Sequence, residues 1–350
     1  MKKELLMGTA LVSTLGAASV AEAVTHTFSG NHQTGMEFDS PSGGTDTNAQ
    51  INDNNFTVSL SETTDGGMTI SSSFKLMDEN AAAGDVDAGF TLAFTDGSKL
   101  DVLNAGNASA SHAVSVPGSA GAEGVANTST NMAPTGLDFM TTSTPFGVEY
   151  HTAADFLADG LKLSVSASTD TGAGPTTTYR TDSHFAIGAT YVTDLGDTSL
   201  TLGGGYSEAD GSISGGTLPN DDTAGVHVGL SAVTGDLTVA VGFADGSVAG
   251  VSDNGSDEYT GEAMKAGVKY VSGDLTFNVG IASGEADDHA LGATTTSPTH
   301  DGQDVTSASI SYAVAAGVTA ILGYTSTASS DEDVASDDGS AWYIGANMSF

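Results

Sequence analysis

The 350-residue chain contains no cysteine, which excludes disulfide bonds, thiol nucleophiles and cysteine-ligated zinc sites. Positive charge is also scarce, because 8 Lys and Arg stand against 44 Asp and Glu, a net charge of -36. Phosphate binding needs clustered positive charge, so a nucleic-acid partner is excluded. No run of about 18 consecutive apolar residues occurs, so a membrane-spanning helix is not expected, and only a closed β-barrel would let this chain cross a bilayer.

Recognisable catalytic motifs are missing as well. The eight histidines are scattered and form no H-E-x-x-H pair, and the sequence has neither a G-x-S-x-G elbow nor a G-x-x-x-x-G-K phosphate loop. A barrel hydrolase whose Ser, His and Asp meet only in space is the alternative that sequence spacing does not exclude. We expect no enzyme and no cofactor.

The N-terminus predicts export from the cytoplasm. Lys2 and Lys3 precede a short, weakly apolar stretch, 5–20, which ends in Ala21-Glu22-Ala23. This order resembles a secretory signal peptide, with cleavage after Ala23. The competing interpretation is a buried N-terminal helix of a cytosolic protein. We therefore divide the chain into a cleaved signal peptide, 1–23, and a mature β-barrel domain, 24–350.

The chain ends on an alternating strand, AWYIGANMSF. Side chains of a strand point alternately to its two faces, so Trp342, Ile344, Met348 and Phe350 share an apolar face, while the other face is mostly small and polar. A strand that stops on a terminal aromatic resembles the assembly signal of bacterial outer-membrane barrels. We expect the barrel-assembly machinery to recognise the Phe350 end.

The same alternation recurs along the mature chain and predicts β-hairpins joined by short turns rich in Gly and Asp. A first strand from about Val24, seven hairpins and the terminal strand make sixteen antiparallel strands. The predicted pairs are 56–60 with 68–76, 90–94 with 100–102, 146–150 with 161–165, 185–191 with 200–202, 226–230 with 237–243, 264–270 with 275–281, and 310–314 with 318–324.

Connections alternate in length, which predicts short periplasmic turns and long external loops. A water-soluble β-sandwich or solenoid is the alternative, but it has no reason to alternate loop length in this way. Carboxylates concentrate in the long loops, at 253–258, 285–288 and 331–338. These oxygens are ligands that calcium prefers, so loosely bound calcium, or divalent ions bridging to lipopolysaccharide, is one interpretation. Adaptation to salty water or repulsion between cells is the other.

The longest connection, 104–145, follows the fifth strand and is rich in small residues. This layout, the segment FTVSLSETTDGGMTISSSFKL at 56–76, the segment GVKYVSGDLTFNVGIA at 267–282 and the terminal strand resemble the general porins of alphaproteobacteria. The resemblance implies an all-β, sixteen-stranded transmembrane barrel of the outer membrane, an inward-folded third loop that constricts the channel, a homotrimer, and passive diffusion of small hydrophilic solutes and ions.

Charged residues on the polar face of the predicted strands are candidates for the channel lining. Mid-membrane lysine costs about 2 to 4 kcal/mol on the lipid face, so exclusion from lipid explains the pattern as well as a solute-binding role does. We expect a mild cation preference from the net charge. A structural or adhesive barrel with a largely closed lumen is the alternative, although short hydroxyl side chains on the inner face indicate a roomy channel. The candidates are Lys75, Lys99, Asp101, Glu149, Lys162, His227, Lys265 and Lys269 on the strands and Glu123 and Asp138 in the third loop.

Overall fold

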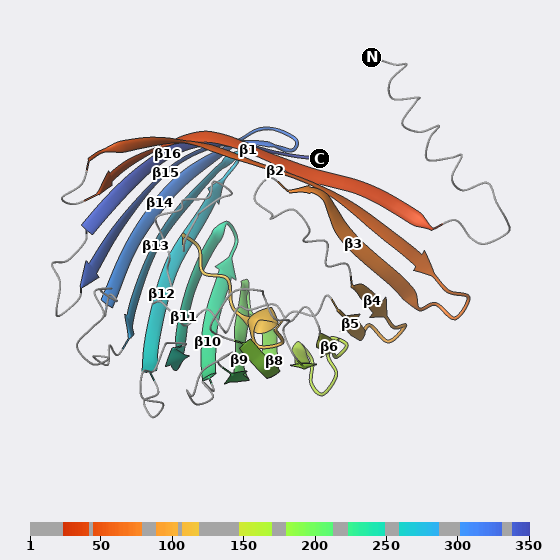
Figure 1. Ribbon diagram of the computed structural model, residues 1–350. Helices are drawn as coiled ribbons and strands as arrows, with labels where there is room; N and C mark the ends of the chain where they lie inside the picture. Colours follow the sequence, from red (N-terminus) through yellow and green to blue (C-terminus); the bar gives the residue numbers. More distant parts are fainter. Residues whose placement is uncertain are drawn as a thin grey trace, which may run out of the picture.

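The computed structural model describes residues 24–41, 45–78, 89–103, 107–118, 147–169, 180–212, 223–248, 259–286, 302–330 and 338–350. Within them, sixteen antiparallel strands close into one barrel in which each strand pairs with its sequence neighbours and β1 pairs with β16 (Figure 1). The predicted strand number and pairing are confirmed. The strands are β1 Thr25–Pro41, β2 Thr47–Thr63, β3 Thr69–Asp78, β4 Phe90–Ala93, β5 Lys99–Val102, β6 Gly147–His151, β7 Leu161–Thr169, β8 Arg180–Leu195, β9 Thr198–Ser212, β10 Thr223–Thr234, β11 Leu237–Val248, β12 Tyr259–Ser272, β13 Leu275–Ala286, β14 Gly302–Ala315, β15 Val318–Ser330 and β16 Asp338–Ser349.

Alternation separates the two faces of the wall. On β16, Trp342 and Ile344 are 53% and 54% exposed, whereas Tyr343 between them is 2% exposed. Tyr343 packs beside Ile51 and Ile321. Many large apolar side chains are exposed along the barrel strands and alternate with small or polar ones, so the outer face is apolar. Such a face needs lipid rather than water around it.

Short turns join the strands at one end of the predicted hairpins, except that the β6–β7 connection, 152–160, is longer. Each of these turns contains a glycine with positive φ, from Gly67 between β2 and β3 to Gly317 between β14 and β15. Residues with a Cβ rarely adopt this conformation, which explains the recurrence of glycine at these turns.

The terminal aromatic residue closes the barrel against the first strand. The amide of Phe350 donates to the carbonyl of Gly30, and the amide of Gly30 donates back to the carbonyl of Phe350, both at 3.2 Å. The Phe350 ring lies 6.2 Å from that of Phe56, which stacks on Phe28 at 5.7 Å. The end of the chain is therefore part of the wall.

The shortest described strands flank the third loop. Strands β4, β5 and β6 have only 4, 4 and 5 residues, whereas the strands across the barrel, β10 to β16 with β1 and β2, have 12 to 17. The described part of the loop, 107–118, contains the 3-10 turn η1, Ala110–His112, and lies inside the curve of the wall (Figure 1). No helix among the described residues is long and apolar enough to span a membrane.

Candidate functional site

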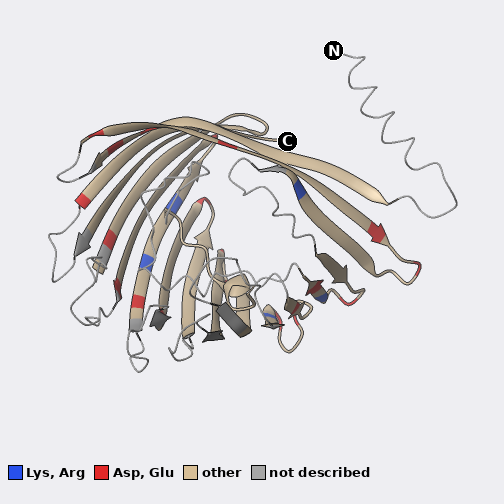
Figure 2. Ribbon diagram, in the orientation of Figure 1, with Lys and Arg blue, Asp and Glu red and all other residues tan. Residues whose placement is uncertain are grey.

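The structure places the strand-borne candidates on the inner face of the barrel. They lie at positions that alternate with exposed or half-buried apolar residues, and Figure 2 shows basic positions on β3 and β12. Glu123 and Asp138 lie outside the described residues, as does the signal peptide 1–23. A role in permeation stays a prediction for all of them. The residues placed on the inner face are Lys75, Lys99, Asp101, Glu149, Lys162, His227, Lys265 and Lys269.

Residues 107–118, here called the loop segment, bind the wall through hydroxyl groups of β7 and β8. The amide of Ala108 donates to Ser166 Oγ at 3.0 Å. His112 is 3% exposed, and its Nε2 lies 2.7 Å from Ser164 Oγ while its Nδ1 lies 2.6 Å from Thr190 Oγ1. Both ring nitrogens of His112 are therefore engaged by the wall.

Two further contacts attach the loop segment to the wall, one on β8 and one on β10. The side-chain amide of Asn107 donates to His184 Nε2 at 3.2 Å, and its oxygen accepts from the amide of Ser109 at 2.9 Å. His227 Nε2 donates to the carbonyl of Ser109 at 2.8 Å. His227, predicted to line the lumen, thus contacts the loop segment.

A row of inward-facing glycines provides the surface on which the loop segment lies. A Cβ atom at Gly188 would overlap the carbonyl oxygen of Ala108, and one at Gly267 would overlap that of Pro117. Only the absence of a side chain allows so close an approach. We call the set the glycine row. It comprises Gly188 on β8, Gly203 and Gly205 on β9, Gly229 on β10, Gly242 on β11, Gly267 on β12 and Gly280 on β13.

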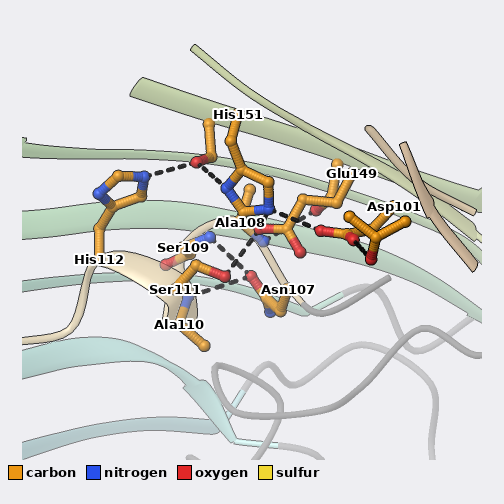
Figure 3. Close-up of polar contacts among 12 residues, drawn as sticks. Asp101, Asn107, Ala108, Ser109, Ala110, Ser111, His112, Glu149 and His151 are labelled. Atoms are coloured by element: carbon orange, nitrogen blue, oxygen red, sulfur yellow. Dashed lines mark hydrogen bonds and ion pairs between the residues drawn. The ribbon is translucent and has the colours of Figure 1, made fainter. Parts of the chain in front are cut away.

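A second polar group lies beneath the start of the loop segment, on β5 and β6 (Figure 3). His151 Nε2 is 3.0 Å from Asp101 Oδ2 and 3.6 Å from Glu149 Oε1. Ser111 Oγ donates to the same Glu149 oxygen at 2.7 Å, and Thr91 donates to the other Asp101 oxygen. Glu149 is 2% exposed, so the loop segment and the wall cover it.

The hydroxyl of Ser164 joins the two groups. It lies 2.7 Å from His112 Nε2 and 2.7 Å from His151 Nδ1. Burial, helped by the positive charge of Lys162 and by His151 and His227, lowers the pKa of His112 to about 4. His112 is therefore neutral at physiological pH, and its two hydroxyl partners are compatible with the neutral ring because a hydroxyl can donate or accept.

The structure changes the interpretation of two features. We took the small hydroxyl residues of the inner face as evidence for a roomy lumen, but Ser164 and Ser166 are 3% and 1% exposed and bind the loop segment instead. Glu149, a candidate for the channel lining, lies beside His151 and is covered by the loop segment and the wall.

Several residues of the site were not singled out from the sequence. His151 shares the inward parity of Glu149, and this parity was the one available signal for it. The glycine row was invisible because glycines at inward positions become neighbours only once the register of six strands is known. Ser164 and Ser166 were placed on the inner face, but their contacts with the loop were not predicted. The residues that sequence reasoning missed are Asn107, His151, His184, Thr190 and the glycine row.

Comparison with known proteins identifies the family. The family model for Gram-negative porins matches residues 8–297, which is most of the chain. The chain belongs to the Gram-negative porin family. No curated protein matches this porin.

Solved porin structures share its fold. A porin refined at 1.8 Å superposes with a TM-score of 0.62 at 18% identity, covering 93% of this chain and 100% of the other. An anion-selective porin from Comamonas acidovorans gives 0.68 at 12%, with 94% and 100% covered. The outer-membrane channel DcaP of Acinetobacter baumannii gives 0.69 at 14%, with 93% and 97% covered. These identities are low, so the likeness concerns the fold.

Family and fold together define the general role. This porin is a multi-pass protein of the outer membrane, and its barrel forms a channel for the passive diffusion of solutes. The loop segment, bound to one side of the inner wall, is part of the channel's lining.

Proposed function

We propose that this porin passes small hydrophilic solutes and ions with a mild preference for cations. The observation that carries the cation preference is the net charge of -36 on a chain that surrounds a lumen. Low-dielectric walls focus such a field and raise the local concentration of cations. Five inner-face lysines, at positions 75, 99, 162, 265 and 269, oppose this field locally, which keeps the expected preference small.

An open lumen is the second part of the proposal. The support is the position of the loop segment, which lies against the glycine row and so stays close to the wall instead of crossing the lumen. The constricting role of 104–145 belongs to this proposal, because residues 119–146 lie outside the described part of the chain. We assign no enzymatic activity and no cofactor to the channel, and calcium at the acidic loops stays a prediction.

A homotrimer in contact with lipid and lipopolysaccharide is the proposed assembly. The short strands β4 to β6 carry exposed apolar side chains on their outer face, including Phe90, Val148 and Tyr150, which suit a subunit contact as well as lipid. The paired hydrogen bonds of Phe350 with Gly30 support its proposed role in barrel assembly, since closure of the wall depends on this end. The mass of the detergent-solubilised protein would test the trimer.

Planar-bilayer recording of the refolded protein across a potassium chloride gradient tests the function. We expect stable conductance steps, grouped in threes if the protein is a trimer, and a reversal potential displaced toward that of potassium. A reversal potential favouring chloride would overturn the cation preference. Absence of steps from a folded barrel, compared with a heat-denatured control, would favour a structural or adhesive barrel with a largely closed lumen.

A further inference from the structure

Among the described residues, one group has the composition of a metal site. It consists of Asp101 on β5 and of Glu149 and His151 on β6, whose ligand atoms all lie within 4.8 Å of one another. The three side chains converge beneath the loop segment (Figure 3). We propose that Asp101, Glu149 and His151 bind one divalent ion of the zinc class inside the barrel.

Burial distinguishes this group from ordinary surface carboxylates. The side chains of Glu149 and His151 are 3% and 8% exposed, and that of Asp101 is 14% exposed. In the described part of the chain, the only ion-pair partner of either carboxylate is His151, although Lys99 and Lys162 share the inner face. Two buried carboxylates with a single histidine partner carry excess negative charge, which a divalent cation would neutralise.

The two distances from His151 lie near those of a small tetrahedral ion, and the Asp101 and Glu149 oxygens lie within 4.8 Å of each other. Bonds of about 2.0 to 2.2 Å to zinc place two ligand atoms of a tetrahedron roughly 3.3 to 3.6 Å apart. His151 Nε2 lies 3.0 Å from Asp101 Oδ2 and 3.6 Å from Glu149 Oε1, which brackets that range. Calcium prefers six to eight oxygen ligands, so this set of one nitrogen and two carboxylates favours the zinc class.

Each ligand is also held by a second residue. Thr91 donates to the outer oxygen of Asp101, and Ser111 donates to Glu149 at 2.7 Å. Histidine ligands of metals usually engage their second nitrogen in a hydrogen bond, as His151 Nδ1 does with Ser164 Oγ at 2.7 Å.

Ser164 links the ion to the loop segment. Its hydroxyl has one proton and lies between His112 Nε2 and His151 Nδ1, so it donates to one ring and accepts from the other. A bound ion requires His151 Nε2 to be free of its proton. His151 Nδ1–H then donates to Ser164, and Ser164 donates to His112, whose remaining proton sits on Nδ1 beside Thr190. In the ion-bound state both rings therefore carry their proton on Nδ1.

Zinc titration of the full-length refolded porin in detergent, followed by calorimetry, tests the site. Excess calcium is present to occupy the acidic loops. We expect one zinc per chain, with affinity reduced roughly 10-fold or more by His151→Gln and by Glu149→Gln. The matched control is His32→Gln on β1, which bonds Asn54 away from the group and should leave zinc binding unchanged. Equal affinity and stoichiometry in the wild type and in His151→Gln would overturn the proposal.

X-ray absorption at the zinc edge provides a test that needs no variant. The proposal expects a nitrogen and oxygen shell at about 2.0 to 2.2 Å with scattering from a single imidazole. A shell without imidazole would place the zinc on the acidic loops, and two or more imidazoles would place it on other histidines. Either result would contradict the proposed site, whether or not the protein conducts ions.

Discussion

Single side chains attach the loop segment to the wall, and Ser164 is the most heavily used of them. Its hydroxyl serves His112 from the loop and His151 from the wall, each at 2.7 Å, and the residue is 3% exposed. A buried polar group that loses its partner costs free energy, because no water replaces the lost contact. The attachment should therefore respond to changes of one or two atoms.

Ser164→Ala is predicted to loosen the loop segment. Loss of a buried hydrogen bond costs about 1 to 3 kcal/mol, which corresponds to a roughly 5- to 150-fold rise in the detached population. The chain has no cysteine, so Ser109→Cys gives a unique thiol reporter at a residue that is 0% exposed and whose Oγ has no partner among the described residues. The measurement is the rate at which a water-soluble thiol reagent labels this reporter thiol.

A matched serine controls for the loss of a hydroxyl as such. Ser59 on β2 also faces inward, and its hydroxyl bonds that of Ser73 rather than the loop segment. Ser59→Ala should leave the labelling rate of the reporter thiol unchanged. Equal rates for Ser164→Ala and the parent would show that Ser164 does not hold the loop.

Acid is predicted to detach the loop segment through His112. The pKa of His112 is lowered to about 4 in the folded protein, whereas a free histidine titrates near 6.5. As the pH falls from about 6.5 to about 4, the detached state takes up a proton that the bound state does not, so the attachment loses stability over that window. Labelling of the reporter thiol, normalised to that of an Asp65→Cys variant in an exposed turn, should accelerate in the same window.

The control for this pH dependence is His112→Gln. Glutamine offers hydrogen-bonding groups but does not titrate, so the acceleration attributable to residue 112 should disappear in this variant. An unchanged pH profile would assign the effect to groups other than residue 112.

At the scale of elements, the glycine row forms the surface of β8 to β13 against which the loop segment packs. Glycine weakens a strand, so its presence here is explained by the contact with the loop and not by strand propensity. The space available for a Cβ atom differs from one glycine of the row to the next, which allows a graded test within one set of residues.

Gly188→Ala is predicted to displace the loop, while Gly242→Ala is predicted to be tolerated. A Cβ at Gly188 would overlap the Ala108 carbonyl oxygen, whereas one at Gly242 would meet only the flexible Lys265 side chain at 3.3 Å and Val116 at 3.6 Å. Overpacking costs about 1 to 3 kcal/mol, a roughly 5- to 150-fold rise in labelling of the reporter thiol for Gly188→Ala. Similar labelling in both variants would mean that the row does not position the loop.

The same scale separates what the sequence predicted from what it did not. The strands were predictable because a period of two is a local signal, and Trp342 and Ile344 lie on the expected outer face. The pairing followed from the Gly-containing turns. The position of the loop segment on the wall depends instead on contacts such as that of His112 with Thr190, which lie 78 positions apart in the sequence, and no local pattern encodes such contacts.

At the scale of the whole molecule, the charge sets the field that ions meet, and its range depends on salt. The Debye length is about 30 Å at 0.01 M and about 3 Å at 1 M ionic strength. Carboxylates of the predicted external loops, such as the five at 331–338, should therefore act on the lumen only in dilute salt. Exposed inner-face groups such as Lys75 should act at close range under both conditions.

The potassium-to-chloride permeability ratio is accordingly predicted to fall as salt rises. Reversal potentials at a fixed gradient, with mean concentrations between about 0.01 and 1 M, measure it. Replacement of the acidic residues at 331–338 by Asn and Gln should lower the ratio in dilute salt and leave it unchanged near 1 M, because the loops are then screened. If the ratio stayed constant across the series, the selectivity would come from groups at the channel wall, and the lysines and carboxylates of the inner face would be its source.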